Sequence, residues 1–129
     1  MYVDVLVGKL ISKLEREGVY DDSVIVLTGD HGPRPFFPSP ERPPERSITN
    51  VPLVIRAPGI NSHVSDVDYQ HIDFGPTLTD ILGLPPPDNA EGVSAFSEER
   101  PQRDKLFNIS AGTFIYSEED DSWHFSQKD

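Results

Sequence analysis

Residues 24–32 read VIVLTGDHG, and this stretch determines both the predicted fold and the candidate site. Its first four residues are apolar, mostly β-branched and too few for a helix. They predict a strand buried on both faces, as in parallel sheets. Gly29 and Gly32 bracket Asp30 and His31, so the backbone can turn sharply where the strand ends. In open α/β sheets this carboxyl edge is where ligands bind.

Asp30 and His31 offer a carboxylate oxygen beside an imidazole nitrogen. This pair of donors suits zinc or manganese, and calcium and magnesium sites also include an occasional histidine. The same residues in a glycine turn can instead simply close the turn, with the aspartate bonding backbone amides and the histidine on the surface. The four residues alone leave both interpretations open.

The composition narrows the classes of function. With 129 residues the chain is expected to form one modest domain with a small core. Its 11 Lys and Arg against 22 Asp and Glu give a formal net charge of −11, which argues against a nucleic-acid partner. The absence of cysteine excludes disulfides and a thiol nucleophile. No apolar run approaches the ~18 residues of a membrane span.

The first 18 residues predict an amphipathic helix that ends at Gly18. Its apolar positions recur at intervals of three and four and predict a buried stripe, formed by Val3, Leu6, Val7, Leu10, Ile11 and Leu14. The pattern is already running near the first residue, and no upstream strand is present to pair with residues 24–27. We therefore expect the chain to be a fragment of a larger domain.

Residues 33–46, PRPFFPSPERPPER, are predicted to form a long loop because proline excludes helix and central strand alike. The loop begins at the candidate metal pair, where substrate-contacting segments are expected. Its arginines, Arg34, Arg42 and Arg46, have the planar donors that bind a sulfate or phosphate oxyanion. The alternative is that they are solvent-exposed and balance Glu41 and Glu45.

The remaining chain predicts short elements. Residues 51–55 read as a second buried strand, and a helix begins near Pro76, with Asp73 or Gly75 as its cap, and ends at Gly83. His71, just before this helix, is either a ligand or anion contact or a structural histidine. Residues 106–109, 113–116 and 123–125 predict short strands, the last two flanking an acidic turn as a hairpin.

Three segments, YDDSVIVLTGDHG, VPLVIRAPG and HIDFGPTLTDILGLP followed by EGVS, resemble in order the C-terminal half of the sulfatase-type branch of the alkaline phosphatase superfamily. The resemblance covers about residues 2–96. It implies an α/β fold, a fragment of the alkaline phosphatase-like sandwich with parallel buried strands, flanking helices and a small C-terminal β-hairpin. We expect a single domain, residues 1–129, with a core at 1–96 and a small β subdomain at about 105–127.

The resemblance also implies roles for residues. In that family the pair before the glycine ligates the active-site metal, which carries over to Asp30 and His31. The cofactor implied is a divalent cation, calcium, magnesium, zinc or manganese. Sulfatases of the family also carry a Cys/Ser-x-Pro-x-Arg nucleophile motif, whereas Ser39-Pro40-Glu41-Arg42 has a different spacing and follows the metal pair. The family's sulfate-contacting lysine has no counterpart in residues 33–50.

From these departures we expect the nucleophile to lie outside this chain, in a missing N-terminal half of the same domain. No catalytic residue is therefore assigned here, and the chain alone is expected to be inactive. The favoured function of the parent protein is metal-dependent hydrolysis of a small-molecule or glycan sulfate ester. The alternatives are a phosphoglycerol or phosphoethanolamine transferase or a phosphodiesterase of the same superfamily, and a non-catalytic fragment or binding module. The resemblance implies an extracytoplasmic location, periplasmic or membrane-attached.

Overall fold

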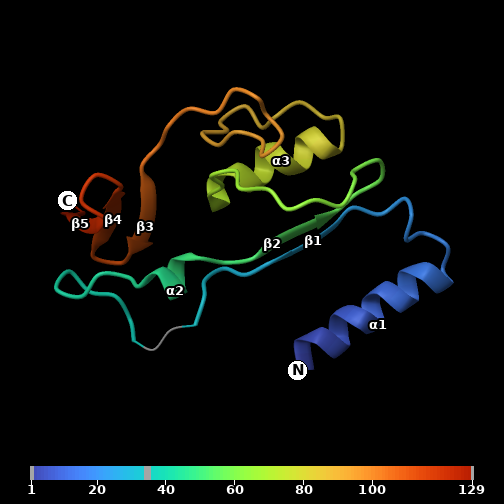
Figure 1. Cartoon of the computed structure of the whole chain (residues 1–129), viewed down its shortest axis with the longest axis horizontal. Coiled ribbons are helices and arrows are strands. Elements are labelled where there is room, and N and C mark those ends of the chain that lie inside the picture. The colour runs from blue at the N-terminus through green and yellow to red at the C-terminus, as the bar shows by residue number, and fades with distance from the viewer. Residues whose placement is uncertain (1, 34–35, 129) are drawn as a thin grey trace. The chain divides into compact units, whose positions relative to one another are not determined.

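The computed structural model describes residues 2–33 and 36–128, so the candidate Arg34 lies outside the described residues. The chain contains both helices and strands (Figure 1). It divides into two compact units. Unit 1 comprises residues 1–29 and 52–64, and unit 2 comprises residues 30–51 and 65–129. The candidate metal pair begins unit 2, directly after the last residue of the first segment of unit 1.

Unit 1 contains helix α1 (Tyr2–Arg16) and strands β1 (Ile25–Thr28) and β2 (Leu53–Arg56). The two strands pair antiparallel, with Ile25 opposite Arg56. The predicted parallel arrangement is therefore wrong for this pair. Parallel neighbours need a crossover, usually a full α-helix, whereas the described residues between β1 and β2 contain only the four-residue helix α2 (Arg46–Thr49).

The predicted burial of these strands on both faces is also wrong. Every residue of β1 and β2 is half-buried or exposed, because the described residues of unit 1 provide no layer over both faces of a two-stranded sheet. Arg56 fixes the turn before β1. Its guanidinium donates to the carbonyls of Asp21 at 3.0 Å and Ser23 at 2.8 Å and lies over the ring of Tyr20.

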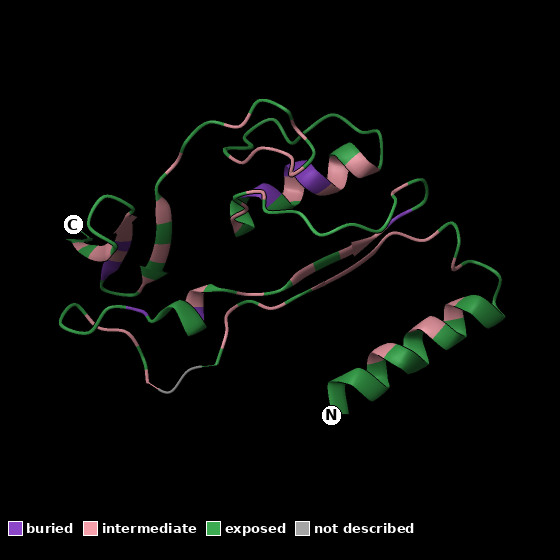
Figure 2. Ribbon diagram, viewed as in Figure 1, coloured by how far each residue is buried: buried purple, intermediate pink, exposed green. Residues whose placement is uncertain are grey.

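Helix α1 forms as predicted and ends before Gly18, which adopts φ +70°. Its apolar stripe is not buried, contrary to prediction. Val7, Ile11 and Leu14 are half-buried at helical spacing, while the other apolar positions of the helix are exposed (Figure 2). The spacing establishes which face is apolar, but the described residues provide too little surface to cover that face.

Unit 2 contains α2 and the short helix η1 (His71–Asp73), which runs into α3 (Phe74–Ile81). Strands β3 (Lys105–Ile109), β4 (Gly112–Ser117) and β5 (Ser122–Gln127) form an antiparallel sheet in that order. The predicted hairpin is confirmed as β4–β5, and β3 adds a third strand. The predicted helix near Pro76 is confirmed as α3. Among the described residues, no helix is long and apolar enough to cross a membrane.

The apolar core of unit 2 is small. Ile48 of α2 and Phe114 of β4 are almost completely buried, and the ring of Phe114 lies 5.0 Å from that of Phe125 on β5. A polar cluster adds to this core around Asp73, whose side chain is 0 % exposed. The carboxylate accepts hydrogen bonds from Arg100 at 2.9 Å and Arg103 at 2.7 Å.

Two backbone amides complete the surroundings of Asp73. The amide of Gln70 donates to one carboxylate oxygen at 3.0 Å and that of Val93 to the other at 2.8 Å. A buried carboxylate with this many donors is compensated for its lost hydration. The cluster therefore joins the start of α3 to the segment that leads into β3.

Candidate metal centre

Asp30 and His31 follow β1 after Gly29, and local hydrogen bonds set their geometry. The amide of His31 donates to Asp30 Oδ1 at 2.9 Å. On the imidazole, Nδ1 lies 2.7 Å from the carbonyl oxygen of Gly32, and Nε2 lies 3.4 Å from Asp30 Oδ2. The Asp30 carboxylate and the His31 imidazole thus lie beside each other.

The contact with Gly32 determines what the neutral ring can bind. A carbonyl oxygen only accepts, so the bond to it assigns the ring proton to Nδ1 and leaves the lone pair on Nε2. That lone pair lies near a carboxylate oxygen of Asp30, and 3.4 Å is less than twice a metal–ligand bond of about 2.0–2.6 Å. A single divalent cation is small enough to contact both atoms, and a carboxylate oxygen and an imidazole nitrogen are donor types that the implied cations accept.

Gly32 is required by the close approach of α2. Its amide donates to the carbonyl oxygen of Ile48 at 2.7 Å. A Cβ at residue 32 would lie 1.7 Å from the carbonyl oxygen of Ser47, a separation that no side chain tolerates. Gly32 is therefore needed both for the turn after the candidate ligands and for the close packing of α2 against this turn.

The pair is accessible to solvent, since the side chain of Asp30 is 88 % exposed and that of His31 is 28 % exposed. Within residues 2–33 and 36–128, no group of three or more His, Cys, Asp or Glu side chains is arranged to hold a metal ion. His71, exposed at the first position of η1, therefore does not join Asp30 and His31 in such a group.

The two described arginines of the proline-rich loop have separate surroundings. Arg42 forms a backbone bridge with Ser39, and its guanidinium carbon lies 3.2 Å above the ring centre of Phe36. Arg46, the first residue of α2, donates to Tyr116 at 3.0 Å and to Asp121 at 2.5 Å. Their predicted contact with an oxyanion stays a prediction.

Arg46 belongs to a cluster that the sequence reasoning missed. The hydrogen bonds from Tyr116 and then Arg46 lower the pKa of Asp121, and the bond to Asp121 raises that of Arg46. The acidic turn could have identified the aromatic residues of this region from the sequence. When Ser117 and Ser122 pair at the ends of the turn, the next pair along the two strands, away from the turn, is Tyr116 and Trp123. The contact with Arg46, 75 residues from Asp121, had no such signal.

Comparison with known proteins supports a single family. A family model described as Sulfatase matches residues 1–84. Arylsulfatase K of Bos taurus is 32 % identical over 124 residues, which cover 89 % of this chain and 22 % of that protein. An ulvan-active sulfatase of Formosa agariphila is 28 % identical, with 87 % of this chain and 19 % of the relative covered.

N-acetylglucosamine-6-sulfatase of Homo sapiens is 36 % identical over 85 residues, or 63 % of this chain and 15 % of that protein. No solved structure matches. The chain thus spans about a fifth of the length of the curated relatives it matches. The family model covers well over half of the chain, and it includes Asp30 and His31. The chain belongs to the sulfatase family.

Proposed function

We propose that the chain is the C-terminal part of the catalytic domain of a metal-dependent sulfate-ester hydrolase with an alkaline phosphatase-type fold. The observation that carries the proposal is the pairing of His31 Nε2 with Asp30 Oδ2 at 3.4 Å, in a chain of the sulfatase family. The relatives add support, since each is named a sulfatase.

In this proposal Asp30 and His31 supply two ligands of a divalent cation: calcium, magnesium, zinc or manganese. The Gly32 carbonyl oxygen accepts a hydrogen bond from Nδ1–H of His31, which keeps Nε2 facing the carboxylate. The charge of Asp30 favours a cation over a neutral ligand at this turn. When bound, the ion would offset charge on the ester oxygens and lower the pKa of the attacking group.

We also propose that the 129-residue chain is catalytically inert and binds metal weakly. Zinc and calcium sites need at least four donors, whereas the described residues group only two here. We expect dissociation constants of about 1 mM or weaker. Calorimetric titration with zinc, manganese, calcium and magnesium measures this. Micromolar binding that disappears in Asp30→Ala, or turnover of an aryl sulfate by the chain, would contradict the proposed incompleteness.

The decisive experiment uses the full-length parent protein. Asp30→Ala and His31→Ala should each lower kcat/KM for an aryl sulfate by at least about 100-fold, with loss of bound metal measured by mass spectrometry. His63→Ala is the matched control, because His63 Nδ1 makes the same kind of local contact, 3.0 Å from the carbonyl of Asn61. Activity within a few-fold of wild type in either ligand variant would rule out the assignment.

A further inference from the structure

Strand β5 (Ser122–Gln127) is an unpaired edge of the three-stranded sheet. One side of β5 pairs with β4, and among the described residues no strand pairs with its other side. His124, Ser126 and Gln127 are exposed, and the other residues of the strand are half-buried. An edge of this kind presents backbone N–H and C=O groups that can pair with a further strand.

β5 lacks the features that usually protect a sheet edge from association, which are charged side chains, proline and bulges. Its residues, SWHFSQ, include no proline and no formal charge when the histidine is neutral, and they pair with β4 in one continuous register. The opposite edge strand, β3, begins with Lys105, whose ammonium group lies 3.2 Å from Glu118 and 3.4 Å from Asp68. β5 is therefore the more available edge of this sheet.

The sequence of β5 is self-complementary about His124. When two copies of the strand pair antiparallel with their His124 residues opposite each other, residues equally distant from His124 are also opposite each other. Trp123 then lies opposite Phe125 of the other copy, and Ser122 lies opposite Ser126. Aromatic pairs and hydroxyl pairs are both favourable in directly opposed positions of antiparallel strands.

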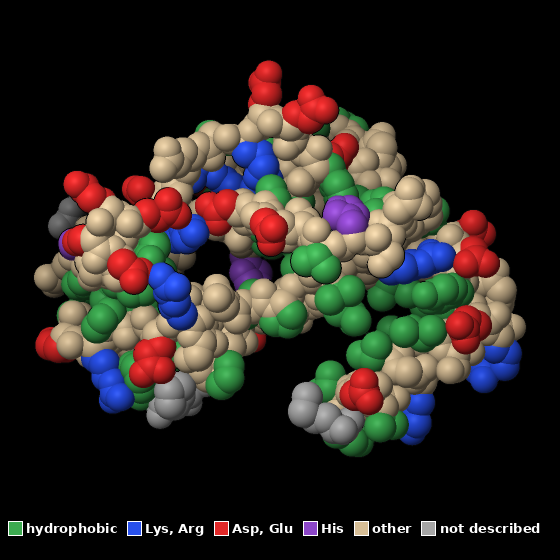
Figure 3. Space-filling view, in the orientation of Figure 1, with side chains coloured by type: hydrophobic (Ala, Val, Ile, Leu, Met, Phe, Trp, Pro, Cys, Tyr) green, Lys and Arg blue, Asp and Glu red, His purple; other side chains and the backbone are tan. Residues whose placement is uncertain are grey.

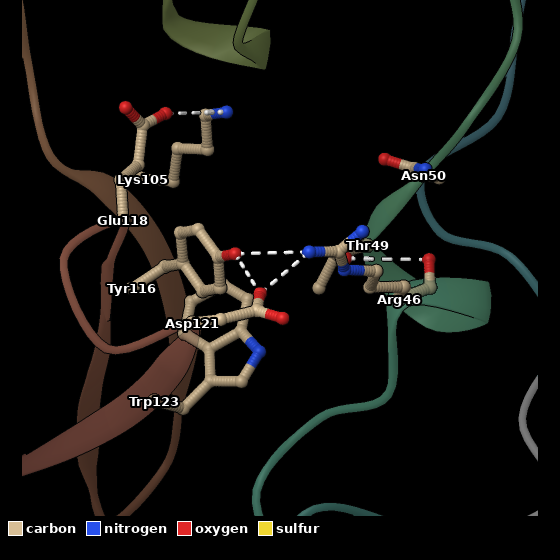
Figure 4. Close-up of a pocket in the computed structure, with 8 residues that line it drawn as sticks. All are labelled: Arg46, Thr49, Asn50, Lys105, Tyr116, Glu118, Asp121 and Trp123. Carbon is tan, nitrogen blue, oxygen red and sulfur yellow. Dashed lines mark hydrogen bonds and ion pairs between the residues drawn. The ribbon is translucent and has the colours of Figure 1, made fainter.

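This pairing extends aromatic contacts that are already present within each copy. The ring centre of Trp123 lies 5.2 Å from that of Tyr116, and the ring centre of Phe125 lies 5.0 Å from that of Phe114. Figure 4 shows the Tyr116 and Trp123 rings beside each other. With Trp123 opposite Phe125 of the second copy, the two pairs become one row of four rings across the paired sheets.

The charges at the two ends of β5 favour an antiparallel partner. Residues 118–121 are acidic and precede the strand, whereas Lys128 follows it. An antiparallel second copy brings its Lys128 to the end of β5 where Asp120 and Asp121 lie. A parallel copy would instead bring two acidic turns together, and the repulsion of like charges opposes that arrangement.

The two His124 side chains do not obstruct the pairing. In each copy Nε2 of His124 lies 3.0 Å from Asp120 Oδ2 and 3.2 Å from Ser122 Oγ, so the ring leans toward its own acidic turn. In an antiparallel pair the two acidic turns lie at opposite ends, and the two rings therefore lean away from each other.

We infer that a second copy of this chain docks on β5 by antiparallel pairing centred on His124. The result is a two-fold symmetric dimer in which β3, β4 and β5 of both copies form one six-stranded sheet. The inference goes beyond the proposed function and does not depend on it, because β5 carries neither Asp30 nor His31.

The register is tested by disulfide cross-linking, because the chain contains no cysteine. His124→Cys places two thiols opposite each other, with Cα atoms about 4.5–5.5 Å apart, a separation that a disulfide spans. Under mild oxidation we expect a covalent dimer on a non-reducing gel. Ser126→Cys is the matched control at another exposed position of the strand. Its two thiols would be about 14 Å apart, so it should cross-link at least about tenfold more slowly.

Sedimentation velocity measures the association of the wild-type chain. Acidic side chains are spread over the face shown in Figure 3, and the net charge of −11 opposes association at long range. About 0.2 M salt screens this repulsion. We expect a dimer with a dissociation constant of about 10–100 μM, as for a small interface.

His124→Lys should weaken the dimer at least about fivefold, because it places like charges directly opposite each other. Leu106→Lys is the matched control. Leu106 is 55 % exposed and lies in the same cross-strand row as His124, through Ile115, but on the opposite edge of the sheet. This variant should dimerise like wild type. Circular dichroism verifies that each variant folds.

Three results would overturn the inference. They are a wild-type chain that stays monomeric up to about 0.5 mM, a dimer that His124→Lys leaves intact or Leu106→Lys abolishes, and equal cross-linking of the two cysteine variants. Asp30→Ala separates this test from that of the proposed function. The dimer should be unchanged in that variant, whereas the activity of the corresponding parent protein tests only the metal assignment.

Discussion

The amide nitrogen of Gly32 lies 2.7 Å from the carbonyl oxygen of Ile48, and this hydrogen bond joins the segment that carries Asp30 and His31 to α2. Ile48 is completely buried, so the attachment is to the core of unit 2. The same helix begins with Arg46, which donates hydrogen bonds to Tyr116 and Asp121. A four-residue helix therefore contacts both the segment of the candidate metal ligands and the three-stranded sheet.

Gly32→Ala tests this attachment. The added Cβ would meet the Ser47 carbonyl oxygen at 1.7 Å, so the backbone must shift and the bond to Ile48 must break. We expect the free energy of unfolding to fall by about 2 kcal/mol or more, measured with urea. Gly8→Ala is the control, because this substitution should raise the free energy of unfolding. A Cβ added at residue 8 would meet nothing within 4 Å, and alanine stabilises a helix by up to about 1 kcal/mol over glycine. Equal effects of the two substitutions would contradict the close approach.

Asp73→Asn tests the buried ion cluster. It leaves Arg100 and Arg103 without their shared carboxylate in a largely buried setting, so we expect a loss of about 3–5 kcal/mol in unfolding free energy. Asp68→Asn is the control, because Asp68 pairs with Lys105 at the surface and its loss should cost at most about 1 kcal/mol. Similar losses in the two variants would show that burial adds nothing at Asp73.

The same cluster predicts an acid-dependent stability. Burial raises the pKa of Asp73, but the amides of Val93 and Gln70 and the two arginines outweigh it and lower the pKa below its ordinary value. A carboxyl whose folded pKa is depressed contributes stability that is complete above its unfolded value, about 3.9, and is lost as pH falls through the folded value.

Urea unfolding of wild type and Asp73→Asn from neutral pH to about pH 2.5 measures this contribution, because the difference between the two proteins should shrink in acid. The exposed Asp120 and Asp121 also have lowered pKa values, but they are present in both proteins and cancel in the difference. If the difference in unfolding free energy between the two proteins stayed constant over this pH range, ionisation of Asp73 would not contribute to the acid dependence of stability.

Arg42→Lys tests the proline-rich loop in the full-length parent. The guanidinium carbon of Arg42 lies 3.2 Å above the ring centre of Phe36. The N–H donors of a guanidinium lie in its plane and can contact an oxyanion. Lysine keeps the charge but loses the planar fork, so kcat/KM for an aryl sulfate should fall by about tenfold. Arg16→Lys should leave it unchanged. An Arg42→Lys enzyme within twofold of wild type would assign this residue to the solvent-exposed alternative.

The sequence by itself determined the local elements and the candidate ligands. Helix spacing and Gly18 predict α1, Pro76 and Gly83 delimit α3, and alternation around an acidic turn predicts the β4–β5 hairpin. The sequence indicates Asp30 and His31 as candidate ligands because the contacts that set their geometry lie within residues 30–32. Each of these features results from interactions between residues close in the chain.

The tertiary structure alone decided the direction of β2 against β1, the exposure of the α1 stripe, the existence of α2 and the clusters around Asp73 and Asp121. The sequence of an apolar strand has the same pattern whether the neighbouring strand is parallel or antiparallel. An apolar stripe indicates which face of a helix is apolar, but it does not indicate what covers that face. Arg46 and Asp121 are 75 residues apart, so only the packing of α2 near the sheet brings their charges together. These features depend on long-range packing, which local patterns do not encode.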